Sequence, residues 1–142
     1  MQHGAIKIRR GKRTDFPALV TLLSPLVSPD KEKAWNRYWR RLVSDPAHDC
    51  YVAEQSGSIQ GMVLVSYIRS LSQCGWQAVL DIIPPFSSSE VSQELVKFAK
   101  VRARQRGCQN MFLWALPEQT PLTPPNKVGF LRTGELFSCG LS

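Results

Sequence analysis

The segment from Ile83 to Val91 holds the residues whose types and spacing bear most directly on chemistry. It contains two prolines, a phenylalanine, three serines and a glutamate, without glycine or a cation. A turn from a strand into a helix commonly binds phosphate, because free N–H groups and the helix dipole point outward together. Ser87 and Glu90 have the S-x-x-E spacing of a capping box, which satisfies those N–H groups internally. The sequence therefore predicts a closed phosphate site, although the hydroxyl and N–H groups of Ser87–Ser89 leave anion binding open.

Cysteine and histidine spacing gives no indication of a metal site. No two of the four cysteines are closer than 24 residues, and neither histidine lies near a second ligand candidate. This spacing gives no disulfide framework either, so we expect reduced cysteines in a cytoplasmic protein and no bound metal. No apolar run reaches the roughly 18 residues that a membrane span requires.

The formal net charge of +7 belongs entirely to the first third of the chain. Residues 1–43 contain 10 Lys and Arg against 3 Asp and Glu, whereas residues 44–142 contain 8 of each. Arg37, Arg40 and Arg41 flank the apolar stripe of a predicted helix there, a stripe that consists of Trp35, Tyr38, Trp39, Leu42 and Val43. This asymmetry indicates either a surface that binds an anionic protein, peptide or nucleic acid, or a solvated basic face without a partner.

Hydrophobic periodicity predicts the elements that position these residues. Helices are expected from Thr14 or Asp15 to Leu23, from Ser28 to the Asp45-Pro46 pair, and over Ser88–Arg106, which Gly107 terminates. Strands are expected over Ala5–Arg10, Cys50–Gln55, Ile59–Arg69, Trp76–Ile83, Asn110–Leu116 and Phe130–Gly140. Four prolines exclude a regular helix from residues 117–129. The order predicts one α+β domain over residues 1–142, with two N-terminal helices and one long central helix.

Several motifs in this order resemble the GNAT superfamily of acetyl-CoA-dependent acyltransferases. IKIRRGKRTDFPALVTLL is similar to that family's first strand and helix, and YVAEQSGSIQGMVLVS is similar to its second and third strands. RARQRGCQNMFLWA and KVGFLRTGE are similar to the end of its central helix and to its closing turn and strand. The resemblance covers nearly the whole chain. It implies a three-layer fold with a mixed, mostly antiparallel sheet of about six strands, and it allows a homodimer formed through the last strand.

The coenzyme A site that the resemblance implies departs from the family pattern R-G-x-G-x-G/A. Aligning Pro84 with the family proline places Ser87 at the arginine, and Glu90 and Ser92 at the two key small positions. A carboxylate next to phosphate repels it, by roughly 4 kcal/mol for charges 4 Å apart at an effective dielectric of 20. Acetyl-CoA is therefore expected to bind weakly or not at all. The resemblance assigns its binding to Ile82, Ile83, Ser87, Ser88, Ser89, Val91 and Ser92.

Catalytic residues are less clearly marked. The family tyrosine that protonates the leaving thiolate corresponds to Pro125. Glu54 and Asp81 are the carboxylates nearest the implied site and are candidate bases, and Tyr67, with Tyr51, is a candidate replacement acid. A solvated or capping role for the carboxylates, and packing for the tyrosines, are the alternatives.

Two functions follow from these residues. One is a non-catalytic or catalytically impaired GNAT-like module that binds an acidic partner through its basic N-terminal third. The alternative is a divergent N-acetyltransferase that moves an acetyl group from acetyl-CoA to an amine. The residues of the 87–92 segment favour the binding module.

Overall fold

The computed structural model describes residues 4–23, 28–72, 74–83, 90–113, 130 and 139–141. Two 3₁₀ turns, Arg13–Asp15 and Pro29–Lys31, precede the first two α-helices. The helices are α1 (Phe16–Leu22), α2 (Glu32–Ser44) and α3 (Glu90–Gln105). The strands are β1 (Lys7–Arg10), β2 (His48–Gln55), β3 (Ser58–Ser70), β4 (Gly75–Ile83) and β5 (Cys108–Leu113).

The five described strands form one sheet in the order β1-β2-β3-β4-β5. Neighbouring strands are antiparallel except β4 and β5, which are parallel and are connected through α3. The prediction of a mixed, mostly antiparallel sheet is confirmed. The sixth predicted strand, over 130–140, lies outside the described residues apart from its ends, and Phe130, Cys139 and Gly140 there are not in a strand.

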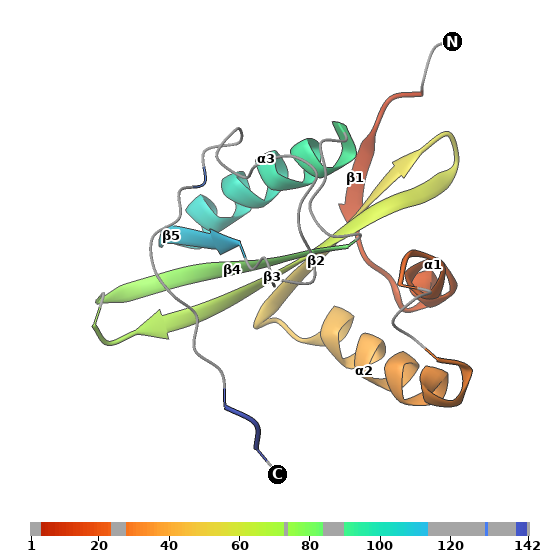
Figure 1. The fold of residues 1–142 in the computed structure, drawn as a ribbon. Helices are drawn as coiled ribbons and strands as arrows, with labels where there is room; N and C mark the ends of the chain where they lie inside the picture. Colours follow the sequence, from red (N-terminus) through yellow and green to blue (C-terminus); the bar gives the residue numbers. More distant parts are fainter. Residues whose placement is uncertain are drawn as a thin grey trace.

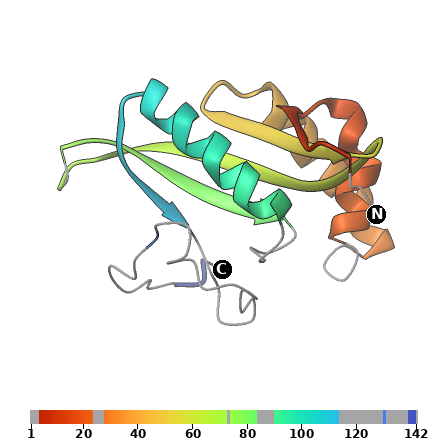
Figure 2. The same cartoon turned by 90° about the horizontal axis from the view of Figure 1, so that it is seen from above.

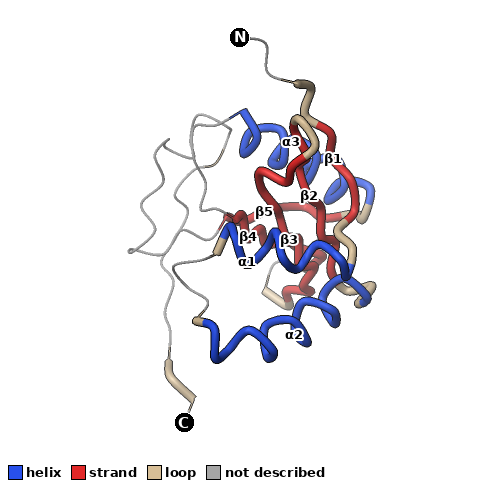
Figure 3. The backbone as a smooth tube through the Cα atoms, turned by 90° about the vertical axis from the view of Figure 1, so that its right-hand side faces the viewer, coloured by secondary structure: helices blue, strands red, loops and turns tan. Residues whose placement is uncertain are grey.

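The helices cover both faces of the sheet. Figure 1 shows α3 along one face and α1 with α2 along the other. Figure 2 shows α3 lying across the strands, and Figure 3 shows the sheet between α3 and α2. The predicted three-layer α+β architecture is therefore confirmed.

Alternating side chains along the strands supply two separate hydrophobic cores. On β3, Val63 and Val65 face α3 and pack with Leu95 and Ala99. The intervening residues face α1 and α2, where Met62 joins a second core with Leu19, Trp39 and Val52. Residues next to each other on one strand thus serve opposite faces of the molecule.

Gly61 allows the beginning of α3 to lie close against the sheet. A Cβ atom at this position would be 3.1 Å from Val91 Cγ1 and 3.3 Å from both the Ile83 carbonyl oxygen and Leu95 Cδ1. The close approach fixes the N-terminal end of α3 beside the end of β4. At the other end of the helix, Gly107 has φ +79°, which confirms the predicted glycine stop.

The N-terminal boundaries of two helices differ from the prediction. Asp15 precedes α1, but its side chain makes no capping hydrogen bond to that helix. Instead Arg9 donates two hydrogen bonds of 2.9 Å to its carboxylate oxygens, and the Lys12 N–H donates a third. A charge-assisted bidentate pair is stronger than a helix cap, so the carboxylate is held by Arg9. The second predicted helix begins as a 3₁₀ turn, and Ser87, the predicted cap of α3, lies outside the described residues.

Candidate functional site

A cavity of about 160 Å³ lies between the sheet and the α1–α2 layer. Its walls come from α1, α2, β2, β3 and β4. Among the described residues, Asp81 is the only charged one that lines it, and the others are Leu19, Leu23, Trp35, Tyr38, Trp39, Leu42, Cys50, Met62, Leu64 and Ile83. An apolar cavity with one polar group that can fix a ligand's orientation is the usual form of a small-molecule site.

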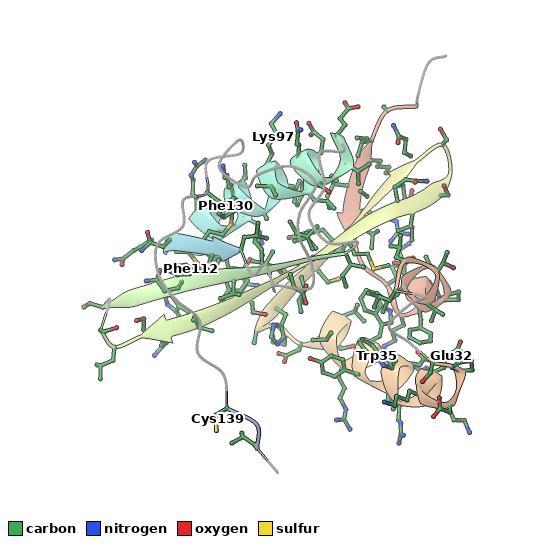
Figure 4. All side chains as sticks on the ribbon, viewed as in Figure 1. Glu32, Trp35, Lys97, Phe112, Phe130 and Cys139 are labelled. Carbon is green, nitrogen blue, oxygen red and sulfur yellow. The ribbon has the colours of Figure 1, made fainter. Side chains whose placement is uncertain are left out.

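The aromatic wall of this cavity belongs to α2. Trp35 comes from that helix on the side of the sheet that α1 also covers (Figure 4). Trp39 is 4% exposed, and its indole Nε1 donates a hydrogen bond of 3.0 Å to the Lys12 carbonyl oxygen. That bond fixes the ring, so the wall is formed before any ligand arrives. Both tryptophans belong to the apolar stripe that the sequence predicts for this helix.

Asp81 lies on β4, opposite Leu64 of β3, and its side chain reaches solvent at the mouth of the cavity. Although the side chain reaches solvent, its apolar neighbours desolvate the carboxyl in part and raise its pKa above the ordinary value. No cation among the residues lining the cavity offsets that effect. A carboxylate with a raised pKa is a stronger base than an ordinary surface aspartate, and Asp81 can accept a proton from a bound amine.

The end of β4 lies next to this cavity. β4 pairs with β3 as far as Ile83, but the described pairing with β5 ends at Leu80 and Leu113. Ile82 is buried toward α3, whereas the side chain of Ile83 lines the cavity. The predicted coenzyme A residues Ile82 and Ile83 are therefore brought to the same strand end as Asp81.

The remaining predicted coenzyme A residues belong to the start of α3 and the segment before it. Val91 packs against the core on the α3 face, and Ser92 is 3% exposed. Glu90 begins the helix and is exposed. Ser87, Ser88 and Ser89 lie outside the described residues.

Glu54 is held in an ion pair. Arg9 Nε donates a hydrogen bond of 2.6 Å to its Oε1, and the same guanidinium binds Asp15. Glu54 is two strands from Asp81 and about four residues further along the register, on the order of 16 Å away by β-sheet spacing. The two candidate bases therefore do not share one site, and Asp81 is the one beside the cavity.

Tyr67 lies on the opposite face of the sheet from Asp81, with the core that α3 covers. Its hydroxyl donates a hydrogen bond of 2.5 Å to Asp49 Oδ2. Burial and that hydrogen bond raise the pKa of Tyr67 far above its ordinary value. Tyr51, on the same face, packs edge-on against Phe98. The structure does not bring either tyrosine to the cavity.

Comparison with known families decides the relationship that the motifs suggest. Residues 16–130 match the model of the acetyltransferase (GNAT) family. This chain belongs to the GNAT family. No curated protein matches it.

Solved structures share the GNAT fold along almost the whole chain. A transcriptional regulator from Bacillus halodurans has a TM-score of 0.78 at 21% identity, covering 96% of this chain and 100% of its own. Glucosamine-6-phosphate N-acetyltransferase from Arabidopsis thaliana has a TM-score of 0.74 at 19% identity, covering 97% and 99%. A predicted acetyltransferase from Clostridium acetobutylicum, solved with acetyl-CoA, has a TM-score of 0.72 at 17% identity, covering 96% of both chains. At these identities the likeness shows the fold alone.

The GNAT family binds acetyl-CoA, and the end of β4 and the start of α3 are the described residues that bear on its binding. Beyond Leu80, the backbone of β4 continues to Ile83 after its described pairing with β5 has ended, which suits an extended amide-containing arm. The exposed carboxylate of Glu90 at the start of α3 opposes a diphosphate at the same place. The described residues at this strand end are therefore Asp81, Ile82 and Ile83 of β4, with Glu90 at the start of α3.

Sequence reasoning missed the cavity and the arginine partners of the acids. The cavity combines residues from five elements, so no local pattern in this GNAT chain indicates it. The Arg9–Glu54 pair joins β1 to β2 across 45 residues. Alternation on β4 was the one available signal, since it places Asp81 and Ile83 on the same face. Among the described residues, no group of His, Cys, Asp and Glu side chains could hold a metal ion. In the same ranges, none of the helices has both the length and the hydropathy of a membrane span.

Proposed function

We propose that this chain is an N-acetyltransferase that moves an acetyl group from acetyl-CoA to a small primary amine bearing an apolar or single-ring side chain. One observation carries the proposal: within the part of the chain that the structure describes, Asp81 is the only charged residue lining an aromatic-walled cavity at the end of β4. The GNAT family match supports acetyl transfer as the reaction class. The cavity supports the choice of acceptor.

The size and walls of the cavity determine the acceptor class. A dry engineered cavity of about 150 Å³ binds benzene, so about 160 Å³ accommodates one aromatic ring or a short alkyl chain. Trp35, Trp39 and Leu42 favour such an apolar body. Asp81 attracts its ammonium group at the mouth. Acceptors with many hydroxyl or ammonium groups are disfavoured, because the apolar walls would leave those groups without partners.

Asp81 acts as the proton acceptor in this mechanism. An amine enters as an ammonium ion and must lose a proton before its nitrogen can attack a carbonyl. The raised pKa of Asp81 brings its basicity closer to that of the amine, which makes the proton transfer less unfavourable. Activity should therefore rise with pH as Asp81 ionises.

The backbone of β4 positions the acyl donor in this proposal. When bound, acetyl-CoA supplies the acetyl group as a thioester. Backbone N–H groups between Asp81 and Ile83 would donate hydrogen bonds to the carbonyl oxygen of the acetyl thioester. Donors placed in this way stabilise the negative charge that develops on that oxygen during the reaction. The new N–C bond replaces the C–S bond, and the departing sulfur takes its proton from water. Repulsion by Glu90 makes the affinity for acetyl-CoA weak.

An acetyl-transfer assay with phenethylamine as acceptor tests the proposal. The N-acetylated amine and free coenzyme A are quantified by chromatography, because the exposed Cys74 and Cys139 would react with a thiol reagent. Asp81→Asn should lower kcat/KM by about 10²–10⁴-fold and remove the rise of activity with pH. Glu94→Gln is the matched control, since Glu94 lies on α3 and pairs with the exposed Lys97. Equal activity in the two variants would contradict the role of Asp81.

A second candidate is the non-catalytic binding module, which the Glu90 carboxylate at the start of α3 favours. Calorimetry with acetyl-CoA separates the two: we expect a dissociation constant no tighter than high micromolar with measurable turnover. If the chain shows no binding and no turnover at millimolar acetyl-CoA, the result favours the binding module.

We also propose that the exposed side chains of Arg37, Arg40 and Arg41 on α2 bind an anionic partner. The local excess of positive charge supports this. The four cysteines are free thiols, which suits a reducing compartment, and we propose a cytoplasmic location.

A further inference from the structure

Three arginines converge on one buried aspartate at the C-terminal end of α3. Asp49, near the start of β2, is wholly buried, with an exposed fraction of 0%. Arg10 comes from the end of β1, and Arg102 and Arg106 come from the last turn of α3 and the residue after it. We call these four residues the Asp49 cluster. It brings three elements together on the α3 face of the sheet.

The carboxylate of Asp49 is fully used within the protein. Its Oδ1 accepts hydrogen bonds from Arg10 Nη2 at 3.0 Å and Arg106 Nη2 at 3.3 Å. Its Oδ2 accepts from the Tyr67 hydroxyl at 2.5 Å and from Arg102 Nε at 3.0 Å. Four donors saturate the two oxygens, so no acceptor capacity remains for the other N–H groups of the guanidiniums.

The guanidiniums, in contrast, are only partly used. Each carries five N–H donors. Beyond Asp49, Arg102 donates to Gln105 and Arg106 donates to the Pro46 carbonyl oxygen. The buried Nε of Arg106 has no hydrogen-bond partner among the described residues. The Arg10 side chain is 59% exposed, and those of Arg102 and Arg106 are 30% and 32% exposed. Within the described ranges, the three arginines therefore keep unpaired N–H donors, and each side chain reaches solvent beside a saturated carboxylate.

The charges of the cluster do not balance. Three guanidiniums and one carboxylate leave a net charge of +2, and the C-terminal end of the α3 dipole subtracts only about half a charge. One arginine would suffice to neutralise Asp49. The excess matches an anion with two negative charges.

Aromatic rings hold two of the guanidiniums in place. The guanidinium carbon of Arg106 lies 4.6 Å from the centroid of the Tyr67 ring, and that of Arg10 lies 5.7 Å from the centroid of the Tyr51 ring. Arginine stacked on an aromatic face and presenting its planar N–H groups is the usual recognition unit for phosphate. The cluster is therefore ordered before any anion arrives.

We propose that the Asp49 cluster binds a phosphate monoester dianion, supplied either by a small metabolite or by a phosphorylated peptide side chain. The site is separate from the acetyl-transfer cavity, because the cluster lies on the α3 face and Asp81 faces the α1–α2 layer. The cluster is also separate from the start of α3, since 16 residues at 1.5 Å each make that helix about 24 Å long.

The first experiment measures binding of inorganic phosphate by ³¹P NMR titration at pH 7.5 and low salt. The wild-type chain should show saturable binding. Arg10→Gln should weaken it roughly tenfold to hundredfold, the loss expected for one charge-assisted contact. Asp49 keeps Arg102, Arg106 and Tyr67 in this variant, so the fold is retained, and thermal unfolding checks that it is. Arg104→Gln is the matched control, because Arg104 is exposed on α3 near Arg102 in sequence and its loss changes the net charge by the same amount.

The second experiment identifies the source of the phosphate. The same titration is repeated with glycerol 3-phosphate and with a phosphoserine heptapeptide beside its unphosphorylated form. Tighter binding of the phosphopeptide than of the small ester assigns the cluster to a peptide, and the reverse order assigns it to a metabolite. Either order supports the site when Arg10→Gln weakens it. If the wild type shows no saturable binding, or if Arg10→Gln and Arg104→Gln lose phosphate affinity equally, the proposal is overturned. The Asp49 cluster would then serve only to hold β1, β2 and α3 together.

Discussion

Replacing Asp49 by asparagine removes the one carboxylate to which three arginines are anchored. The substitution preserves shape, so no cavity forms and the effect is electrostatic. An asparagine carbonyl can still accept two of the four hydrogen bonds that reach Asp49. The remaining two donors lose their acceptor, and the guanidiniums lose the only negative charge of the cluster.

The expected loss of stability is about 3 kcal/mol. Hydrogen bonds to charged groups contribute about 1.5–3 kcal/mol each, and breaking a buried ion pair costs about 3–5 kcal/mol. The lower part of that range applies because the three arginine side chains are 30–59% exposed and water compensates them in part. For a domain of this size, about 3 kcal/mol corresponds to a fall of roughly 6–12 °C in Tm.

The pH dependence of that loss distinguishes electrostatics from packing. Burial by itself would raise the pKa of Asp49, but hydrogen bonds from Tyr67 and Arg102 and the nearby arginine charges outweigh it and hold the pKa below its ordinary value. Between the folded pKa and the unfolded value of about 3.9, the unfolded chain binds more protons, so stability rises with pH there. The difference between wild type and Asp49→Asn should be constant above about pH 5 and should shrink as pH falls below about 4.

Urea unfolding at pH 7 and at intervals down to pH 3 measures both quantities. Asp45→Asn is the control, because Asp45 is exposed and surface substitutions usually change stability by less than about 0.5 kcal/mol. A loss below about 1 kcal/mol at pH 7, or a loss that stays the same at pH 3, would refute the view that ionised Asp49 anchors the three arginines.

Two further substitutions test the placement of α3 and the role of α2. Gly61→Ala should destabilise the fold by about 1–3 kcal/mol and lower acetyl transfer, because the new Cβ meets the Ile83 carbonyl oxygen and Val91. Gly140→Ala is the control, because a Cβ there meets open space. Equal urea midpoints for the two variants would contradict the close contact at Gly61. Changing Arg37, Arg40 and Arg41 to glutamate should abolish salt-sensitive binding of a polyglutamate peptide while leaving Tm nearly unchanged. The control variant changes Arg69, Lys97 and Arg104 to glutamate. If both variants bind the same amount of peptide, no specific surface on α2 is involved.

Local patterns predicted the fold well because each element carries its own periodicity. Alternation predicted β2, β3 and β4 to within three residues at either end, and helical spacing placed Trp35 and Trp39 on the buried stripe of α2. The motifs of 110–116 predicted β5, which begins two residues earlier, at Cys108. The fate of Asp15 was not predictable from its neighbours, since its partner Arg9 belongs to the preceding strand and competes with the helix for the same oxygens.

The candidate site was harder to predict than the fold, because it depends on which residues meet across elements. Sequence spacing brought Ile82, Ile83 and Asp81 to one strand end, but it gave Glu54 and Asp81 equal standing as bases. The structure distinguishes the two acids, because Arg9, 45 residues from Glu54, holds Glu54 in an ion pair away from the cavity. The basic excess was likewise assigned to the first third alone, although Arg102 and Arg106 from the central helix join Arg10 around Asp49.

Three aspartates, Asp15, Asp49 and Asp81, differ in the direction of their pKa shifts. Hydrogen bonds from Arg9 lower the pKa of Asp15, and those from Tyr67 and Arg102 help to lower that of Asp49, so both are ionised at neutral pH and contribute stability. No cation is present among the described residues that line the cavity with Asp81, and desolvation by the apolar wall raises its pKa. A raised folded pKa means that stability is complete below the unfolded pKa and declines as pH rises through the folded one. Ionised Asp81 therefore contributes no stability at neutral pH, and because its side chain reaches solvent the cost of its charge is small. Asp81→Asn should accordingly leave Tm unchanged or slightly higher while lowering kcat/KM for acetyl transfer by about 10²–10⁴-fold, whereas Asp49→Asn should lower Tm and leave transfer intact.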